Sequence, residues 1–141
     1  NSSLAAVATP NSGLLVALND LKDGRFRLRL MSTDSNLDFW KPLINLDESP
    51  DPEGNPFSAE AYREIIGDKF RLSSGPRREI LADEFLVNLD QRVCEDTGCN
   101  FEYEYPYFIK SDDGLYHIVY SWNNTFIKHV SFNDAWLEEQ L

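Results

Sequence analysis

The sequence predicts a mainly β fold, built from short antiparallel strands with tight turns and interrupted by a partly helical insertion. Three observations support this prediction. Residues 103–132 hold three aromatic and β-branched runs, separated by an Asp-Gly turn and an Asn-Asn turn. Residues 4–46 hold four more short runs with turn residues between them. Between these regions, residues 58–66 carry apolar side chains at four-residue spacing, the pattern of a helix.

The composition excludes several classes of protein. The chain has 141 residues, of which 42% are hydrophobic, and this is enough for one folded domain. Its formal net charge of −11 argues against nucleic acid as a partner, because such binding needs clustered Lys and Arg. No apolar run reaches the ~18–20 residues of a membrane span, so we expect none. The chain begins with Asn1 and not with Met, so we expect a processed or partial piece of a longer protein.

The first four strands are expected in chain order. Residues 4–8 are a short apolar run, and residues 14–18 are a continuous one, as expected for a strand buried on both faces. Residues 25–32 alternate strictly between apolar and basic side chains. The basic face is interpreted as a solvated strand face, with an anion-binding row as the alternative; it comprises Arg25, Arg27 and Arg29. Residues 41–46 complete a four-stranded unit, which has the size of a propeller blade.

The link between the third and fourth strands resembles a known motif. STDSNLDFW, at residues 32–40, is similar to the Asp box of sialidase blades, S-x-D-x-G-x-T-W. Ser32 and Asp34 match this motif. Asn36 stands for the Gly and can also take positive φ, and Phe39 replaces the Trp. The resemblance implies a structural role, in which side-chain oxygens accept hydrogen bonds from the turn and the aromatic residue packs in the blade.

A second resemblance covers residues 102–130. Sialidase-like proteins of the BNR-repeat type end with a segment similar to E-Y-S-Y-P, D-G, H-I-x-Y-x-W and I-K-H-V. This chain has EYEYP, DG, HIVYSW and IKHV in the same order and with the same spacing. Residues 1–46 and 102–132 together carry the resemblance. It implies a partial six-bladed β-propeller of sialidase type, of which this chain holds about two blades.

Four segments follow from this resemblance. Residues 1–46 are expected to form a four-stranded blade with a degenerate Asp box. Residues 47–101 are expected to form an insertion lobe with a helix and a turn between two cysteines. Residues 102–132 are expected to form a three-stranded final blade, and residues 133–141 a C-terminal helix.

Two helical or extended stretches are expected inside the insertion. The first covers residues 58–66, with Ser58 as its N-cap and Gly67 as the residue that ends it. The second covers residues 78–89, where the pattern leaves a helix and a strand open.

The resemblance also implies a role for one tyrosine. Retaining sialidases use a tyrosine nucleophile activated by a glutamate, an aspartate acid/base, and three arginines that hold the substrate carboxylate. Tyr103 matches the family's tyrosine and is the candidate nucleophile, with a packed aromatic as the alternative. Glu104 stands where the family has Ser. Strand alternation predicts Tyr103 and Tyr105 on one face, so a base would come from another blade.

Three other side chains are candidates for chemistry. Trp122 could stack on a sugar or pack against a neighbouring blade. His117 and His129 fall on adjacent predicted strands. A metal or acid/base pair and ordinary sheet residues that hydrogen-bond between blades both remain open for them. We expect no metal site and no cofactor.

Two cysteines, Cys94 and Cys99, enclose a short turn. A metal site needs more ligands, and a redox site usually has two intervening residues. We therefore predict a local disulfide, with two free thiols as the alternative. An oxidised pair implies a secreted or lumenal compartment. Asn1 and Asn123 begin Asn-x-Ser/Thr sequons and are candidate glycosylation sites, which fits that compartment.

Together these features predict the C-terminal part of a sialidase-like glycoside hydrolase that acts on sialic-acid-type glycans. The chain alone is not expected to be active, because the active site of a propeller draws residues from nearly every blade. The alternatives are a catalytically silent relative serving as a structural or interaction subunit, and a glycan-binding module. The expected partners are a sialylated glycan and the remaining blades, on the same or another chain. We expect exposed apolar patches on the two blades, from Leu15, Phe26, Ile118 and Tyr120.

Overall fold

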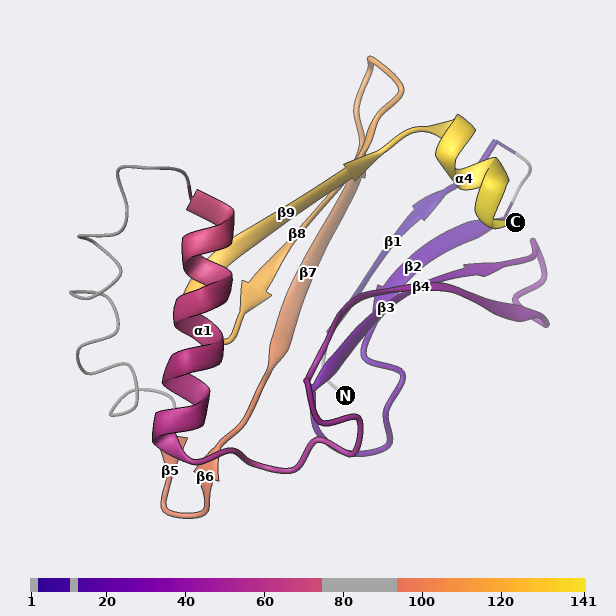
Figure 1. Ribbon diagram of the computed structural model, residues 1–141. Coiled ribbons are helices and arrows are strands. Elements are labelled where there is room, and N and C mark those ends of the chain that lie inside the picture. Colours follow the sequence, from indigo (N-terminus) through magenta and orange to yellow (C-terminus); the bar gives the residue numbers. More distant parts are fainter. Residues whose placement is uncertain (1–2, 11–12, 75–93) are drawn as a thin grey trace. The chain divides into compact units, whose positions relative to one another are not determined.

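The computed structural model describes residues 3–10, 13–74 and 94–141 (Figure 1). Two sequence-based expectations, the element at residues 78–89 and the sequon at Asn1, lie outside the described residues. The described part is mainly β, with several antiparallel sheets, as the sequence predicts. Neither described helix has the length and apolar character needed to cross a membrane.

The chain divides into two compact units, and each is described by itself. The first comprises residues 1–52 and 101–141, and the second comprises residues 53–100.

The first unit begins with a four-stranded antiparallel sheet in chain order. Its strands are β1 (Leu4–Ala8), β2 (Leu14–Leu18), β3 (Arg27–Thr33) and β4 (Trp40–Glu48). β2 is apolar at every position, and its three central residues are buried. β3 alternates, and its inward side chains Leu28 and Leu30 are fully buried. The period-two pattern of the sequence therefore predicted the buried face of this strand correctly.

A three-stranded antiparallel sheet follows in the same unit. Its strands are β7 (Tyr103–Lys110), β8 (Tyr116–Trp122) and β9 (Phe126–Phe132). The turn residues Gly114, Asn123 and Asn124 have φ values of 86°, 51° and 52°, as their residue types predict. α4 (Asp134–Gln140) comes next, and its N-cap Asn133 accepts a 2.9 Å hydrogen bond from the Trp136 amide.

The apolar patches lie elsewhere than the sequence suggested. Leu15, Ile118 and Tyr120 are buried, and Phe26 is half-buried, so the prediction that they would form open patches was wrong. The physical reason is that these side chains pack within the unit. The Tyr120 hydroxyl oxygen, for example, lies 3.4 Å from the Leu46 carbonyl oxygen of β4. The large side chains left exposed on the strands of the unit are Leu4, Trp40, Tyr105, Tyr107, Ile109 and Ile127.

The Asp-box turn has the expected structural role but different details. Asp34 Oδ1 accepts hydrogen bonds from the amides of Asp38 (2.9 Å) and Phe39 (3.2 Å). Positive φ falls on Leu37, at 63°, and not on Asn36. The carboxylate fixes the two amides that follow Leu37, so the chain reverses at Leu37. Phe39 is 76% exposed, so it does not pack as the motif implied.

The second unit contains α1 (Ala59–Ser74) and a hairpin of β5 (Cys94–Glu95) with β6 (Gly98–Cys99). Ser58 caps α1 by accepting a 3.2 Å hydrogen bond from the Ala61 amide. Gly67 does not end the helix, which was the wrong part of that prediction. An internal glycine costs only about 1 kcal/mol relative to alanine. Burial of Tyr62 and Ile66 on the same helix offsets this cost.

A disulfide joins Cys94 and Cys99, whose Cα atoms are 4.1 Å apart. Phe57 forms a β-bridge with Cys99, and each backbone amide donates to the other's carbonyl at 2.9 Å. Gly98 has φ 125°, and a Cβ there would lie 2.8 Å from the Phe57 carbonyl oxygen. The cysteine turn is therefore held to the segment that precedes α1.

Candidate functional site

The entry to β7 is fixed by contacts with the other sheet of the first unit. The Tyr103 amide donates to the Arg25 carbonyl at 2.9 Å. Asn19 Nδ2 donates to the Tyr103 carbonyl at 3.0 Å and to the Arg27 carbonyl at 2.7 Å. The Asn123 side chain accepts from the Glu102 amide at 2.7 Å. This segment is therefore held from both sides.

An irregularity follows at Tyr105, and it overturns the predicted alternation. The β7–β8 register shifts between Glu104 and Tyr107, and Tyr105 has φ 51°. Tyr103 is fully buried whereas Tyr105 is 58% exposed, so the two rings do not share a face. A proline inside a strand marks a bulge, and Pro106 was the sequence signal that the strict alternation overlooked.

An ion pair lies beside the exposed ring. Glu104 is only 5% exposed, and its carboxylate pairs with the Arg25 guanidinium. The Arg25 guanidinium carbon lies 5.6 Å from the centre of the Tyr105 ring, within the range of a cation–π contact. The Tyr105 amide donates to Ser3 Oγ at 3.2 Å. Burial of Glu104 is thus compensated by Arg25, and both groups flank an exposed tyrosine.

Tyr105 opens onto a groove between β1 and β7. This groove has a volume of about 620 Å³ and is lined by residues 3–6 and 105–108. Leu4, Tyr105 and Tyr107 all have large exposed surfaces along it. An exposed aromatic ring in a groove with a neighbouring charge pair is suited to packing against a polar ring such as a sugar.

Tyr103, the candidate nucleophile, is enclosed. Its hydroxyl donates to the Glu48 carbonyl at 3.2 Å, and its ring centre lies 6.2 Å from that of Trp122. In this arrangement a substrate has no access to the phenol. The surroundings favour the packed aromatic of the two roles considered for Tyr103.

Two other tyrosines have carboxylate partners, which is the pairing that an activated phenol needs. Tyr120 donates to Asp47 at 2.5 Å, and Tyr116 donates to Asp134 at 2.8 Å. Burial raises the pKa of both phenols, and the Asp47 carboxylate raises the Tyr120 pKa further. Both rings are buried, so these pairs are structural contacts and not nucleophile–base pairs.

The arginine face of β3 is paired with carboxylates. Arg27 Nε donates to Asp20 at 2.9 Å, and this hydrogen bond raises the pKa of Arg27. Arg29 pairs with the other oxygen of Asp20 and donates to Asn45 at 2.8 Å. These partners favour the ordinary strand face over an anion-binding row.

Trp122, which ends β8, and Asn123, in the turn that follows, are buried as well. The Trp122 ring stacks on Phe126 with 4.5 Å between ring centres, so it has little surface for a sugar. Asn123 is 1% exposed, and its Nδ2 is enclosed without a hydrogen-bond partner among the described residues. A glycan on this nitrogen would displace its surroundings in the folded chain.

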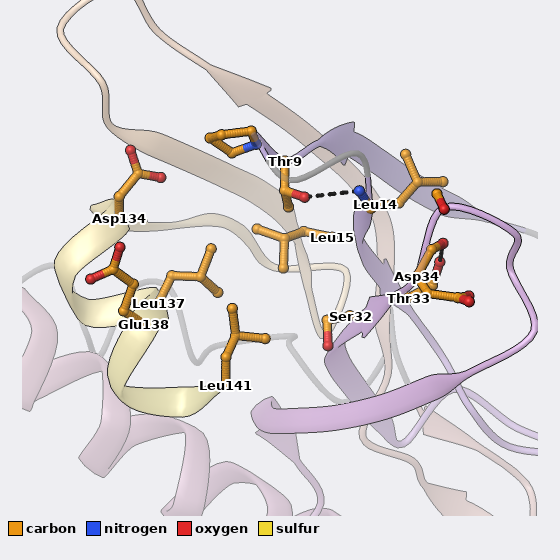
Figure 2. Close-up of a pocket in the computed structure, with 13 residues that line it drawn as sticks. Thr9, Leu14, Leu15, Ser32, Thr33, Asp34, Asp134, Leu137, Glu138 and Leu141 are labelled. Carbon is orange, nitrogen blue, oxygen red and sulfur yellow. Dashed lines mark hydrogen bonds between the residues drawn. The ribbon is translucent and has the colours of Figure 1, made fainter.

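A second hollow lies between α4 and the ends of the four-stranded sheet (Figure 2). It measures about 420 Å³, with Leu15, Leu137 and Leu141 among its apolar lining residues. Three carboxylates line it: Asp34 holds the Asp-box turn, Asp134 pairs with Lys110 at 2.9 Å, and the third is Glu138. Nothing here adds to the cluster around Tyr105. In the described ranges, no three His, Cys, Asp or Glu side chains form a metal-holding group.

Comparison with known proteins agrees with the sheet architecture. Residues 1–118 match the family model described as the BNR repeat-like domain, which is found in sialidases and related propellers. The match extends through the insertion, beyond the segments that carried the resemblance in the sequence. No curated protein and no solved structure gives a significant match. Since the family match covers most of the 141 residues, the chain belongs to the BNR repeat-like domain family.

Proposed function

We propose that this chain is the glycan-contacting part of a sialidase-like glycoside hydrolase that acts on sialic-acid-type glycans. The observation that carries the proposal is the exposed ring of Tyr105, at φ 51°, beside the ion pair between Arg25 and the buried Glu104. Non-glycine residues in sparsely populated backbone conformations cluster at binding sites. Membership in the BNR repeat-like domain family supports a sugar as the ligand.

A net charge of −11 disfavours binding of an acidic sugar, but the charges beside the groove are paired. A bare glutamate beside the groove would repel a substrate carboxylate, but Arg25 compensates Glu104 at short range. The apolar face of a saccharide can pack on the Tyr105 ring while its hydroxyl groups remain hydrated. Since Tyr103 is enclosed, the remaining blades, on the same or another chain, would supply the nucleophile, the acid, the base and further arginines.

A catalytically silent, glycan-binding relative is the second candidate. The enclosure of Tyr103, whose hydroxyl donates to the Glu48 carbonyl, favours it, because the family's nucleophile position then offers no reachable phenol. The two candidates share the Tyr105 site and differ only in whether bond cleavage follows binding.

One experiment separates them. The full-length protein is assayed for hydrolysis of a fluorogenic sialoside, and its binding to sialyllactose and to lactose is measured by calorimetry. Tyr105→Gly removes the ring while allowing the observed φ. Phe39→Ala, which removes an exposed aromatic from the Asp-box turn, is the control.

A hydrolase should cleave the sialoside, and Tyr105→Gly should lower kcat/KM at least tenfold while Phe39→Ala leaves it unchanged. Binding of sialyllactose without cleavage, weakened by Tyr105→Gly, would establish the silent relative. Equal binding and cleavage in the wild type and Tyr105→Gly would reject the site itself.

We also infer a secreted or lumenal location, since the Cys94–Cys99 disulfide persists in oxidising compartments.

A further inference from the structure

Four polar side chains form one continuous hydrogen-bonded series from the β7–β8 turn to β9. Asp113 Oδ1 lies 2.5 Å from Ser111 Oγ, which lies 3.0 Å from His117 Nε2. His117 Nδ1 in turn lies 3.0 Å from His129 Nε2. The imidazole planes are within 14° of parallel, with ring centres 5.2 Å apart. The two rings therefore face each other through their nitrogens, from neighbouring strands.

The direction of these hydrogen bonds follows from the acceptors around Ser111. Its hydroxyl has one proton, and two groups beside it only accept: the Asp113 carboxylate and the Leu115 carbonyl at 3.0 Å. The hydrogen bond from Ser111 is the main influence that lowers the pKa of Asp113 and keeps it ionised. The Ser111 proton therefore points to these acceptors, and His117 Nε2–H must donate to Ser111.

This direction decides what each nitrogen can do. In the neutral ring with its proton on Nε2, His117 Nδ1 accepts from His129 Nε2–H. In a catalytic serine the hydroxyl donates to the histidine, so Ser111 is not an activated nucleophile. Instead, His117 presents an unprotonated nitrogen whose orientation is fixed by a hydroxyl and, behind it, a carboxylate.

We propose that His117 and His129 bind a divalent transition-metal ion of the class that prefers imidazole: Zn²⁺, Ni²⁺ or Cu²⁺. Metal-binding histidines almost always donate their second ring N–H to a carboxylate, carbonyl or water, which fixes the tautomer. His117 has this support through Ser111 and Asp113. The ion takes the place of the proton between the rings, and that proton moves through solvent to His129 Nδ1, so His129 stays neutral.

The hydrogen bond directs the lone pair of His117 Nδ1 at His129 Nε2, 3.0 Å away. An ion at about 2.0–2.1 Å from His117 Nδ1 lies on this line, so the His129 ring must shift aside to bind it in an adjacent coordination position. His129 is exposed, so its ring can turn its lone pair toward the ion. Two imidazoles are fewer protein ligands than structural or catalytic zinc sites have, so water fills the other positions and the affinity is modest.

The test titrates ZnCl₂ and NiCl₂ alone into the full-length protein by calorimetry. His117→Gln and His129→Gln should each weaken one binding event at least tenfold. Ser111→Ala should weaken the same binding event by about tenfold. This is the lower end of the range found when a group hydrogen-bonded to a metal ligand is removed. Ser121→Ala, on the same strand as His117 and outside the hydrogen-bonded series, should leave it unchanged.

A second measurement uses only the unmodified protein, so its result does not depend on whether a variant folds. In the unmodified protein, sub-stoichiometric Cu²⁺ should broaden the NMR signals of the amides next to both histidines, and of Ile109 opposite His117 on β7, before those of the four-stranded sheet. Absence of binding, binding unchanged in both histidine variants, or broadening elsewhere would overturn the metal site. Unchanged affinity in Ser111→Ala would overturn the supporting role of Ser111.

Discussion

The phenolic oxygen of Tyr120 lies 2.5 Å from Asp47 Oδ2, and Nζ of Lys128 lies 2.7 Å from the same oxygen. Asp47 belongs to β4 of the four-stranded sheet, whereas its partners belong to β8 and β9 of the three-stranded sheet. One carboxylate therefore links the two sheets of the first unit.

Asp47→Ala should lower the free energy of unfolding of the full-length protein by about 1–3 kcal/mol, because the buried Tyr120 hydroxyl loses its closest acceptor. Urea denaturation measures this change. Asp38→Ala is the matched control, since Asp38 is exposed and should change the free energy by less than about 0.5 kcal/mol. Equal effects of the two substitutions would show that the Asp47 contacts contribute nothing specific.

Asp134 should make stability depend on acid pH. Its pKa is lowered from 3.8, mainly by hydrogen bonds from Lys110 and then Tyr116. A carboxyl group whose folded pKa is depressed contributes stability above its unfolded pKa, and this is lost as pH falls through the folded pKa. We expect the unfolding free energy to fall below about pH 4, less steeply in Asp134→Asn than in the wild type.

Urea denaturation at a series of pH values tests this expectation, with Glu139→Gln on the same helix as the control. Parallel pH profiles for the wild type and Asp134→Asn would contradict it.

Tyr105 should respond to substitution according to backbone strain. Its φ of 51° is unfavourable for residues other than glycine, and a β-branched side chain tolerates it least. Tyr105→Gly should relieve about 1 kcal/mol of strain, whereas Tyr105→Val should destabilise the protein. Thermal unfolding of both variants provides the comparison. If valine is as well tolerated as glycine, the left-handed conformation is not adopted in solution.

Cys94 and Cys99 should resist alkylation in the native protein and become reactive only after reduction, as mass spectrometry can show. Closing so short a ring should stabilise by about 2 kcal/mol on the chain-entropy model. The double variant Cys94→Ser/Cys99→Ser should therefore unfold more readily, and reducing agent should not destabilise it further. Free thiols before reduction would reject the disulfide.

Residues 1–141 expressed alone should not form a well-behaved cooperative monomer. Tyr107 and Ile127 are 75% and 70% exposed on the three-stranded sheet, and isolated domains rarely tolerate such surfaces. Sedimentation and thermal unfolding of this fragment test the expectation. A sharp transition from a monomer would remove the argument that further blades complete the fold.

Much of the secondary structure was predictable because strands and caps leave local signals. The alternation in β3, the turn glycine Gly114 and the caps Ser58 and Asn133 all act within a few residues. α1 was predicted too short, because the penalty for Gly67 is local whereas the burial that offsets it is not.

The candidate site was predicted only in part. The motif around EYEYP indicated the start of β7, where the proposed site lies, but it selected Tyr103, which is enclosed. The bulge at Pro106, with its register shift, puts Tyr103 and Tyr105 on different faces of β7, so the Tyr105 ring is the exposed one. The partnership of Arg25 with Glu104 joins residues 79 positions apart, and no local pattern indicates it.

The sequence by itself determined the strand order, the turn positions, the cysteine pairing and the family, since each rests on neighbouring residues or a continuous motif. Only the tertiary structure decided which side chains are enclosed, which carboxylate each arginine meets, and which tyrosine faces solvent. Burial and ion pairing depend on contacts between distant segments. A single bulge at Tyr105 was enough to change which tyrosine a ligand can reach.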